Sequence, residues 1–311
     1  MYRRKRFQNK VCTSSFLLPV CAVVCVLLWL LVPPIDTSKF IGLAFCGVTT
    51  ALMIELNNTN MLIRVRSRMV SATFVMLWSA CQFLHPFGWS HVAALCMMIC
   101  YHALFHSYQQ MQAMNDAFII FLSLGICSLI IPPMVVVALP FLIALWAFRA
   151  MSIRAFFACI LGFITPLWIV LGWLYFKDGI PDAIAYYTPL LQLDFATHAL
   201  EPNRIWAFCF VVGMALISSI HFMRTNFQDK IRVRMLFYFL LWMQLIWVAM
   251  MVLFSQQFDV YFLLYIMTVS PLIAHFFTLS NTWVSNAFFV LCMILFFAFT
   301  GCNIWMPSFS F

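Results

Sequence analysis

Long, uninterrupted apolar runs are the feature that most constrains how this chain can fold. A helix needs roughly 20 residues to cross the hydrocarbon of a bilayer, and only helices or closed barrels leave no backbone polar group unsatisfied there. The runs are continuous rather than alternating, which favours helices. We therefore predict an all-α, polytopic transmembrane helical bundle with about eleven spans, near residues 11–33, 40–56, 69–84, 90–107, 116–131, 134–149, 155–176, 204–223, 235–255, 259–278 and 283–303.

Composition excludes the main soluble classes of protein. Of the 311 residues, 65% are hydrophobic and 8% are charged, and the mean hydropathy is +1.01, whereas a soluble domain has about 45–50% apolar and about 25% charged residues. The net charge of +8 lies in short clusters between the apolar runs, which indicates membrane lipids rather than nucleic acid as partners. The twelve cysteines lie in or beside apolar stretches and form no CxxC pair, so no disulfide framework, metal or cofactor is expected.

The basic residues also predict an orientation, because Lys and Arg gather on the cytoplasmic side of membrane helices. With the N-terminus inside, the inner segments carry 14 of the 17 basic residues and the outer segments carry 3. The first apolar run is too long for a signal peptide, so 11–33 is expected to be a retained helix. We predict one membrane domain over residues 1–311, a C-terminus outside and one long outer loop, 177–203. Pro132 and Pro133 leave almost no loop, so 116–149 forms either two short spans or one re-entrant hairpin.

A polar cluster follows the second span on the predicted inner side. It could bind the headgroup of a lipid, because arginines pair with anionic oxygens. The simpler interpretation is a helix end, a turn and a positively charged anchor. The candidate headgroup-binding residues are Glu55, Arg64, Arg66 and Arg68.

Two further patterns lie within predicted spans. Tyr261, Tyr265, Thr268 and His275 share one stripe of the tenth span, which indicates either packing between helices or a polar groove along a substrate path. His102 and His106 stand four residues apart, a spacing that suits two metal ligands. No third ligand is close in sequence, because Asp116 is expected to cap the next helix together with Asn115, so no metal site is predicted.

Acidic and basic residues also gather on the predicted outer face. A glycosyl transfer from a lipid-phosphate donor needs a carboxylate as general base and a cation at the leaving phosphate. The candidate catalytic residues are Asp36, Asp178 and Asp182, and the candidate substrate-binding residues are His198, Arg204, Tyr265 and His275. The alternative is that topology alone places these side chains outside.

Two segments resemble a family of uncharacterised multi-pass inner-membrane proteins of Bacteroidota. They are 101–148 and 160–178, and the motif positions are Asn115, Phe118, Gly162, Phe163, Thr165 and Pro166. The likeness covers about half of the chain. It implies a compartment and an architecture but no reaction, since the family has no established activity. Its layout is similar to that of polytopic glycosyltransferases that use polyprenyl-phosphate sugars, but here the first outer loop, 33–39, is too short for their catalytic loop.

These observations lead to one functional prediction and two alternatives. We expect a bacterial inner-membrane protein that acts on lipid-linked glycan or envelope precursors at the outer leaflet, as a polyprenyl-phosphate-sugar-dependent glycosyl transferase or polymerase. The first alternative is a non-catalytic subunit of an envelope complex with a partner still to be found. The second is a transporter of lipids or small molecules that uses the polar stripe of the tenth span.

Overall fold

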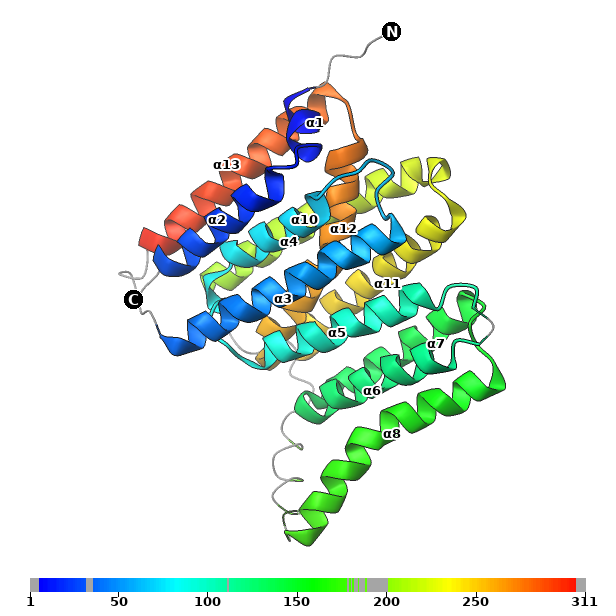
Figure 1. Cartoon of the computed structure of the whole chain (residues 1–311). Coiled ribbons are helices and arrows are strands. Elements are labelled where there is room, and N and C mark those ends of the chain that lie inside the picture. Colours follow the sequence, from blue (N-terminus) through cyan, green and yellow to red (C-terminus); the bar gives the residue numbers. More distant parts are fainter. Residues whose placement is uncertain are drawn as a thin grey trace. The chain divides into compact units, whose positions relative to one another are not determined.

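The computed structural model describes residues 6–31, 36–110, 112–177 and 201–305, together with 179, 181, 184 and 188. These residues form helices and no β-strand, which confirms the all-α fold class. Each of the eleven predicted spans contains a helix (Figure 1). In the described part of the chain, six helices are long and apolar enough to cross a membrane. They are α3 (Thr37–Asn60), α8 (Ile153–Phe176), α10 (Pro202–Thr225), α11 (Ile231–Leu253), α12 (Phe258–Leu279) and α13 (Trp283–Trp305).

The remaining elements are shorter or less apolar. They are α1 (Phe7–Cys12), α2 (Leu17–Leu31), α4 (Met69–Ala80), α5 (Trp89–His106), α6 (Met114–Ile130) and α7 (Ala138–Ala147). Short 3-10 helices are η1 (Gln82–Leu84), η2 (Pro132–Val137), η3 (Asn226–Gln228) and η4 (Ser255–Gln257). The proline pair thus begins η2, which leads directly into α7.

The first predicted span is not the continuous helix expected for residues 11–33. Helix α1 ends at Cys12 and α2 begins at Leu17. The Thr13 hydroxyl donates to the Asn9 carbonyl at 2.8 Å, and the Ser14 hydroxyl accepts from the Phe16 amide at 3.3 Å. Hydroxyl side chains that bond the local backbone compete with helix formation. The expectation of one unbroken helix was therefore wrong at these residues.

The chain divides into two compact units, whose boundary falls within α5, α11 and α12. The first unit comprises Met1–His91, Leu200–Phe237 and Tyr265–Phe311. In it α4 packs against α2 and α3, and α1 lies against α13 (Figure 1). The second unit comprises Val92–Ala199 and Tyr238–Leu264.

In the second unit, α6 and α8 approach each other closely at two glycines. A Cβ on Gly162 of α8 would lie 2.6 Å from the Phe118 carbonyl oxygen of α6. A Cβ on Gly125 of α6 would lie 2.6 Å from the Pro166 ring of α8. Small residues that let helix backbones meet in this way are typical of membrane helix pairs. Phe118, Gly162 and Pro166 of the family motif therefore lie in this helix contact.

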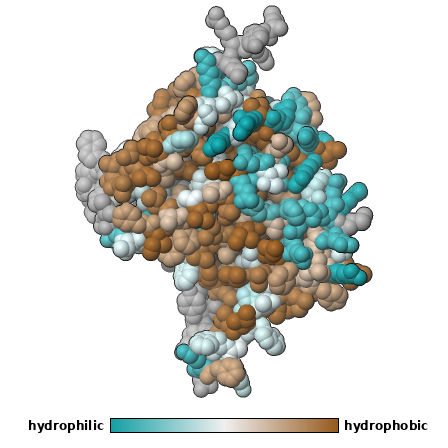
Figure 2. Space-filling model, in the orientation of Figure 1, coloured by the Kyte–Doolittle hydropathy of each residue, from teal (hydrophilic) through white to brown (hydrophobic). Residues whose placement is uncertain are grey.

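Large apolar side chains cover the outer sides of many helices. Trp168 and Phe176 on α8 are 75% and 86% exposed. Figure 2 shows broad hydrophobic areas on the visible face, in brown. A soluble monomer rarely exposes continuous apolar areas of this kind. Together with the six long apolar helices, this surface shows a protein suited to a membrane.

Candidate functional site

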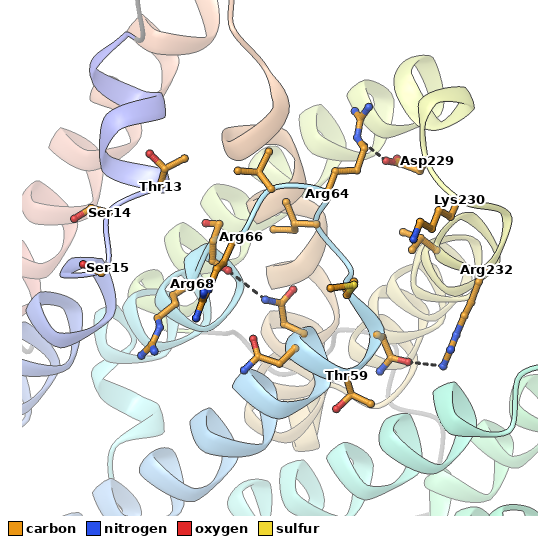
Figure 3. A pocket seen from close by; sticks show the side chains of 18 residues that line it. Thr13, Ser14, Ser15, Thr59, Arg64, Arg66, Arg68, Asp229, Lys230 and Arg232 are labelled. Carbon is orange, nitrogen blue, oxygen red and sulfur yellow. Dashed lines mark hydrogen bonds and ion pairs between the residues drawn. The ribbon is translucent and has the colours of Figure 1, made fainter.

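The first unit contains a cavity of about 1120 Å³ with a mixed polar and apolar lining, which we call the arginine basin. Three segments that are far apart in sequence line it: residues 13–15, residues 57–68 except Leu62, and residues 229–233 except Ile231. The lining contributes five basic residues, one acidic residue, hydroxyl groups and three asparagines. Its basic residues are Arg64, Arg66, Arg68, Lys230 and Arg232 (Figure 3). This donor-rich set fits an anion.

The end of α3 gives the basin its shape. Met61 follows Asn60 in the left-handed region, with φ 48° and ψ 51°, and so turns the chain sharply out of the helix. The Asn57 side chain then donates to the Ser67 carbonyl at 3.2 Å and closes the loop. The Ser67 hydroxyl accepts from the Met69 amide at 3.1 Å, at the start of α4. These contacts hold the segment between α3 and α4 over the cavity.

The basic side chains of the basin differ in the partners that they contact. Arg64 forms an ion pair with Asp229, and Arg232 donates to the Asn60 side chain at 2.9 Å. The contacts of the described residues give Arg66, Arg68 and Lys230 no acidic partner. Arg66 and Arg68 lie at the left of the hollow in the view of Figure 3, and Lys230 lies at the right. Three of the five basic side chains around the cavity thus have no acidic partner among the residues that the structure describes.

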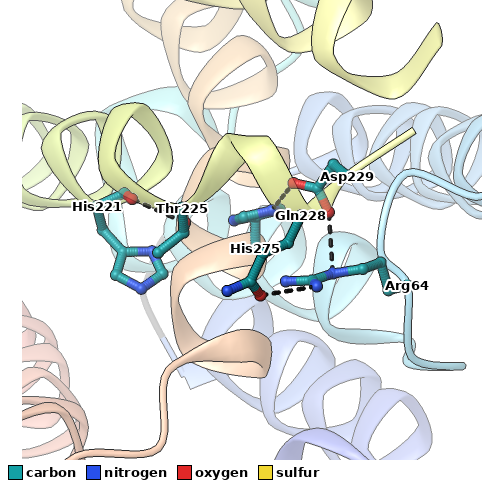
Figure 4. A network of polar contacts seen from close by, with 6 residues as sticks. All are labelled: Arg64, His221, Thr225, Gln228, Asp229 and His275. Atoms are coloured by element: carbon teal, nitrogen blue, oxygen red, sulfur yellow. Dashed lines mark hydrogen bonds and ion pairs between the residues drawn. The ribbon is translucent and has the colours of Figure 1, made fainter. Parts of the chain in front are cut away.

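A buried ion network adjoins the basin (Figure 4). The Asp229 carboxylate lies 2.9 Å from Arg64 Nε and 3.0 Å from His275 Nε2. The side chains of Asp229 and His275 are 1% and 0% exposed, whereas that of Arg64 is 37% exposed. Arg64 Nη1 also donates to the Gln228 side chain at 2.9 Å. A carboxylate this deeply buried needs such partners, because an unpaired buried charge is costly.

The structure brings together three of the four residues predicted to bind a headgroup. Arg64, Arg66 and Arg68 line the arginine basin. Glu55 is exposed on α3 and does not line it. Asn58 and Thr59, which lie on the same side of the helix one turn after Glu55, do line it, so the basin begins one turn beyond Glu55.

The stripe of the tenth span is buried within the protein. Tyr261, Tyr265, Thr268 and His275 are at most 2% exposed, and none of them lines the arginine basin. The Tyr261 hydroxyl donates to the Gln257 side chain at 2.9 Å. His275, which was predicted as a substrate contact, bonds Asp229 and so joins the buried ion network that adjoins the basin.

The residues predicted on the outer face are described only in part. Asp36 is exposed and precedes α3, without a side-chain bond that caps the helix. Arg204 forms an ion pair with Glu201 at 2.9 Å and lies 5.4 Å above the Phe83 ring. Asp178, Asp182 and His198 lie outside the described residues. The predicted outer-face site therefore stays a prediction.

One of the two histidines near the end of α5 contacts Asp116, which was expected to cap α6. His106 Nδ1 lies 2.9 Å from the Asp116 carboxylate. Asp116 is in the first turn of α6, whose N-cap is Ala113, so the expectation that Asn115 and Asp116 cap the helix was wrong. In the part of the chain that the structure describes, no group of three or more metal-ligating side chains is present.

A second buried cluster lies near the other end of α3. The His85 ring stacks on Trp29 with ring centres 3.9 Å apart, and its Nε2 lies 3.1 Å from the Ser79 carbonyl. Burial lowers the pKa of His85 to about 4. A neutral imidazole packed on an indole supports the fold and offers no charge to a ligand.

Sequence reasoning missed the contribution of residues 229–233 to the site. Lys230 and Arg232 entered only the count of basic residues on the inner side, and Asp229 was not proposed as a site residue. The count of Lys and Arg on each side of the membrane could have indicated this contribution, because it predicts that segments 57–68 and 224–234 lie on the same side. Two basic segments on one side can share one anion site.

Comparison with known proteins adds a family but no activity. The sequence model of a family of unknown function, DUF6427, matches residues 5–304. The chain belongs to this family. No curated protein and no solved structure matches the chain. The predicted resemblance to a family without an established activity agrees with this match, and function has to be argued from the site.

Proposed function

We propose that the chain is a bacterial inner-membrane protein of eleven spans that binds the phosphate group of an anionic lipid or lipid-linked envelope precursor in the arginine basin. The observation that carries this proposal is the presence of Arg66, Arg68 and Lys230 around one cavity without an acidic partner among the described residues. Arginine pairs well with phosphate oxygens, and hydrogen bonds to a charged group are about twice as strong as neutral ones. Hydroxyl and amide groups of the same lining can bind the remaining oxygens.

The proposed topology places the basin at the cytoplasmic face, with the N-terminus inside and the C-terminus outside. Contacts between segments of the first unit support this alternation. The predicted inner segments meet each other, as in the pairs Arg64–Asp229 and Gln8–Asn286. The predicted outer segments also meet each other, since Ser38 accepts from the Phe87 amide at 3.0 Å.

A membrane-borne ligand is favoured over a soluble one by the mixed lining of the basin. Met61 and Val65 are exposed apolar residues of the same loop that carries Arg64, Arg66 and Arg68. Such a loop can contact acyl chains while its arginines hold the headgroup, as amphipathic membrane-surface segments do.

Lipid binding by the purified chain tests this proposal. The double variant Arg66→Gln/Arg68→Gln should bind dihexanoyl phosphatidylglycerol at least about tenfold more weakly than the wild type, because it loses two charge-assisted contacts. The matched control is Arg224→Gln, which removes a basic residue of the same unit that does not line the basin. Equal affinity of the double variant and the wild type, or equal binding of dihexanoyl phosphatidylcholine, would overturn the proposal. Inorganic phosphate as a second probe separates a lipid headgroup from a free anion.

The predicted transfer reaction at the outer leaflet is a separate, finer proposal. The exposure of Asp36 leaves its carboxylate accessible to an acceptor hydroxyl. The ion pair with Glu201 already engages Arg204, which weakens its predicted role at a leaving phosphate. Growth of cells that carry Asp36→Asn tests the base role, because an envelope enzyme should lose function while the protein is still produced. An assembly subunit should tolerate this change, and a transporter should instead be sensitive at Thr268 or His275.

A further inference from the structure

The buried carboxylate of Asp229 connects the arginine basin to the interior of the first unit. Arg64 holds one of its oxygens and His275 of α12 holds the other, at 2.9 and 3.0 Å (Figure 4). The carboxylate is 1% exposed, so its counter-ions come from the protein and hardly from solvent. If one of these partners is removed, the other must compensate for the lost interaction with the carboxylate.

Arg64 is the partner that an anion in the basin can remove. Its side chain is 37% exposed and lines the cavity, whereas Asp229 and His275 are enclosed. A phosphate beside Arg66 and Arg68 would compete with Asp229 for the Arg64 guanidinium. Asp229 would then keep a full negative charge in a site of low polarity with His275 as its remaining contact.

His275 can take over as the counter-ion without losing the bond that it already makes. The hydrogen bond to Asp229 uses Nε2, and Nδ1 is buried with no hydrogen-bond partner among the described residues. Neutral histidine carries one proton, and its second nitrogen can accept another. A proton added at Nδ1 therefore converts the ring to an imidazolium while Nε2–H continues to donate to Asp229.

Among the described residues, the titratable or charged groups that lie around His275 include His221, Asp229 and Arg64. From α10, the ring of His221 lies 6.2 Å from that of His275. From the segment before α11 comes Asp229, and the segment between α3 and α4 supplies Arg64, which reaches His275 only through Asp229. Two phenylalanines of α10 and α11 pack against the ring with centres 5.3 and 5.2 Å away, Phe222 and Phe237.

We propose that His275 is a proton-binding site coupled to the arginine basin. When an anion takes the Arg64 guanidinium, one proton from solvent binds His275 Nδ1, and the imidazolium replaces the guanidinium as the counter-ion of Asp229. The bound state gains one negative charge from the anion and one positive charge from the proton, so the two changes cancel. This inference rests on the proposed anion binding and adds to it the uptake of a proton.

Coupling of this kind predicts the direction in which the affinity for the anion changes with pH. Because the proton binds only together with the anion, affinity for the anion rises as the pH falls, by about tenfold per pH unit where one full proton is taken up. Anion binding without the coupling leaves the affinity nearly independent of pH, provided that the anion itself does not titrate.

Calorimetry of the purified full chain in two buffers with different ionisation enthalpies counts the protons. The probe is dihexanoyl phosphatidylglycerol, whose phosphodiester does not titrate near neutral pH, and sulfate serves as the free-anion arm. Binding of the lipid alone indicates a headgroup site, whereas equal binding of sulfate indicates a site for free anions. In both cases we expect about one proton per bound anion in the wild type.

Matched variants assign the proton to a residue. His275→Gln should bind the probe with no proton uptake and a flat pH dependence, because glutamine can still donate to Asp229 but cannot gain charge. His221→Gln, which changes the neighbouring histidine, should take up the same number of protons as the wild type. Arg64→Met serves if His275→Gln fails to fold. With the guanidinium absent from the start, residual binding should take up no proton.

The outcomes separate this inference from the proposal on which it rests. Probe binding with no proton uptake in the wild type, or uptake that persists in His275→Gln, would overturn the coupling while anion binding stands. Absence of probe binding in the wild type would overturn both. Arg66→Gln should weaken binding with an unchanged proton count, since it alters the basin and leaves the network intact.

Discussion

Replacement of Arg64 by methionine should destabilise the protein, and the loss should be larger at high pH than at low pH. Methionine keeps much of the apolar stem of arginine but removes the guanidinium that lies 2.9 Å from Asp229. The Asp229 carboxylate is 1% exposed and cannot move into solvent without opening the fold. Its charge then depends on His275, which supports it only weakly when the imidazole is neutral.

The size of the effect follows from the burial of the two partners. Removal of one member of a fully buried ion pair costs about 3–5 kcal/mol. Arg64 is 37% exposed, so solvent already screens part of its attraction, and about 2 kcal/mol is a reasonable value at pH 8. For a chain of 311 residues, with an unfolding entropy of about 2.1 cal/mol/K per residue, that corresponds to a fall of about 3 °C in the melting temperature.

The sign of the pH dependence follows from proton linkage. In the variant, a proton on His275 supplies the counter-ion that Asp229 has lost, so protonation favours the folded chain. That stabilisation is present at low pH and is lost as the pH rises. Arg64→Met should therefore lose less stability at about pH 6 than at about pH 8, because the proton proposed for His275 replaces the missing counter-ion.

Thermal unfolding in lipid nanodiscs, followed by tryptophan fluorescence at both pH values, measures this difference. Arg66→Met is the matched control, because it removes the same kind of side chain from the same loop without breaking an ion pair of the described residues. Its change should stay within about 0.5 kcal/mol. An equal loss for the two variants, or a loss for Arg64→Met that is the same at both pH values, would refute the reasoning.

Two more outcomes are expected elsewhere in the fold. Gly162→Ala should lower the melting temperature measured in the same assay, because its Cβ would meet the backbone of α6 at 2.6 Å, whereas Gly172→Ala should not, since no atom lies within 4 Å of that position. Acidification should cost stability as the pH falls from about 6.5 to 4, because burial lowers the pKa of His85 to about 4 and the unfolded chain then binds more protons. His85→Gln should remove that part of the slope, and an unchanged slope would show that other groups cause it.

Much of the helical framework could be predicted because apolar runs in the sequence indicate which residues are buried or contact lipid. The same signal could not locate the break between α1 and α2, since Thr13, Ser14 and Ser15 are short polar residues that a membrane helix tolerates. The break arises from their local hydrogen bonds, which depend on geometry rather than hydropathy. Whether all eleven helices cross the membrane stays a prediction.

The candidate site could be predicted only where it is local in sequence. Arg64, Arg66 and Arg68 lie within five residues, so their proximity was visible in the sequence. Asp229 is 165 residues from Arg64 and 46 from His275, and no local pattern indicates that the three meet. Their network depends on tertiary contacts between the segment after α3, the segment before α11 and helix α12.

A cryo-EM map of the chain in nanodiscs of phosphatidylglycerol and phosphatidylcholine, with a bound antibody fragment to aid alignment, tests the central claim most directly. The account predicts headgroup density in the arginine basin, with a phosphate within hydrogen-bond distance of Arg66 or Arg68, roughly 2.7–2.9 Å. An empty basin in such a map, with Arg66 and Arg68 turned to solvent, would contradict it.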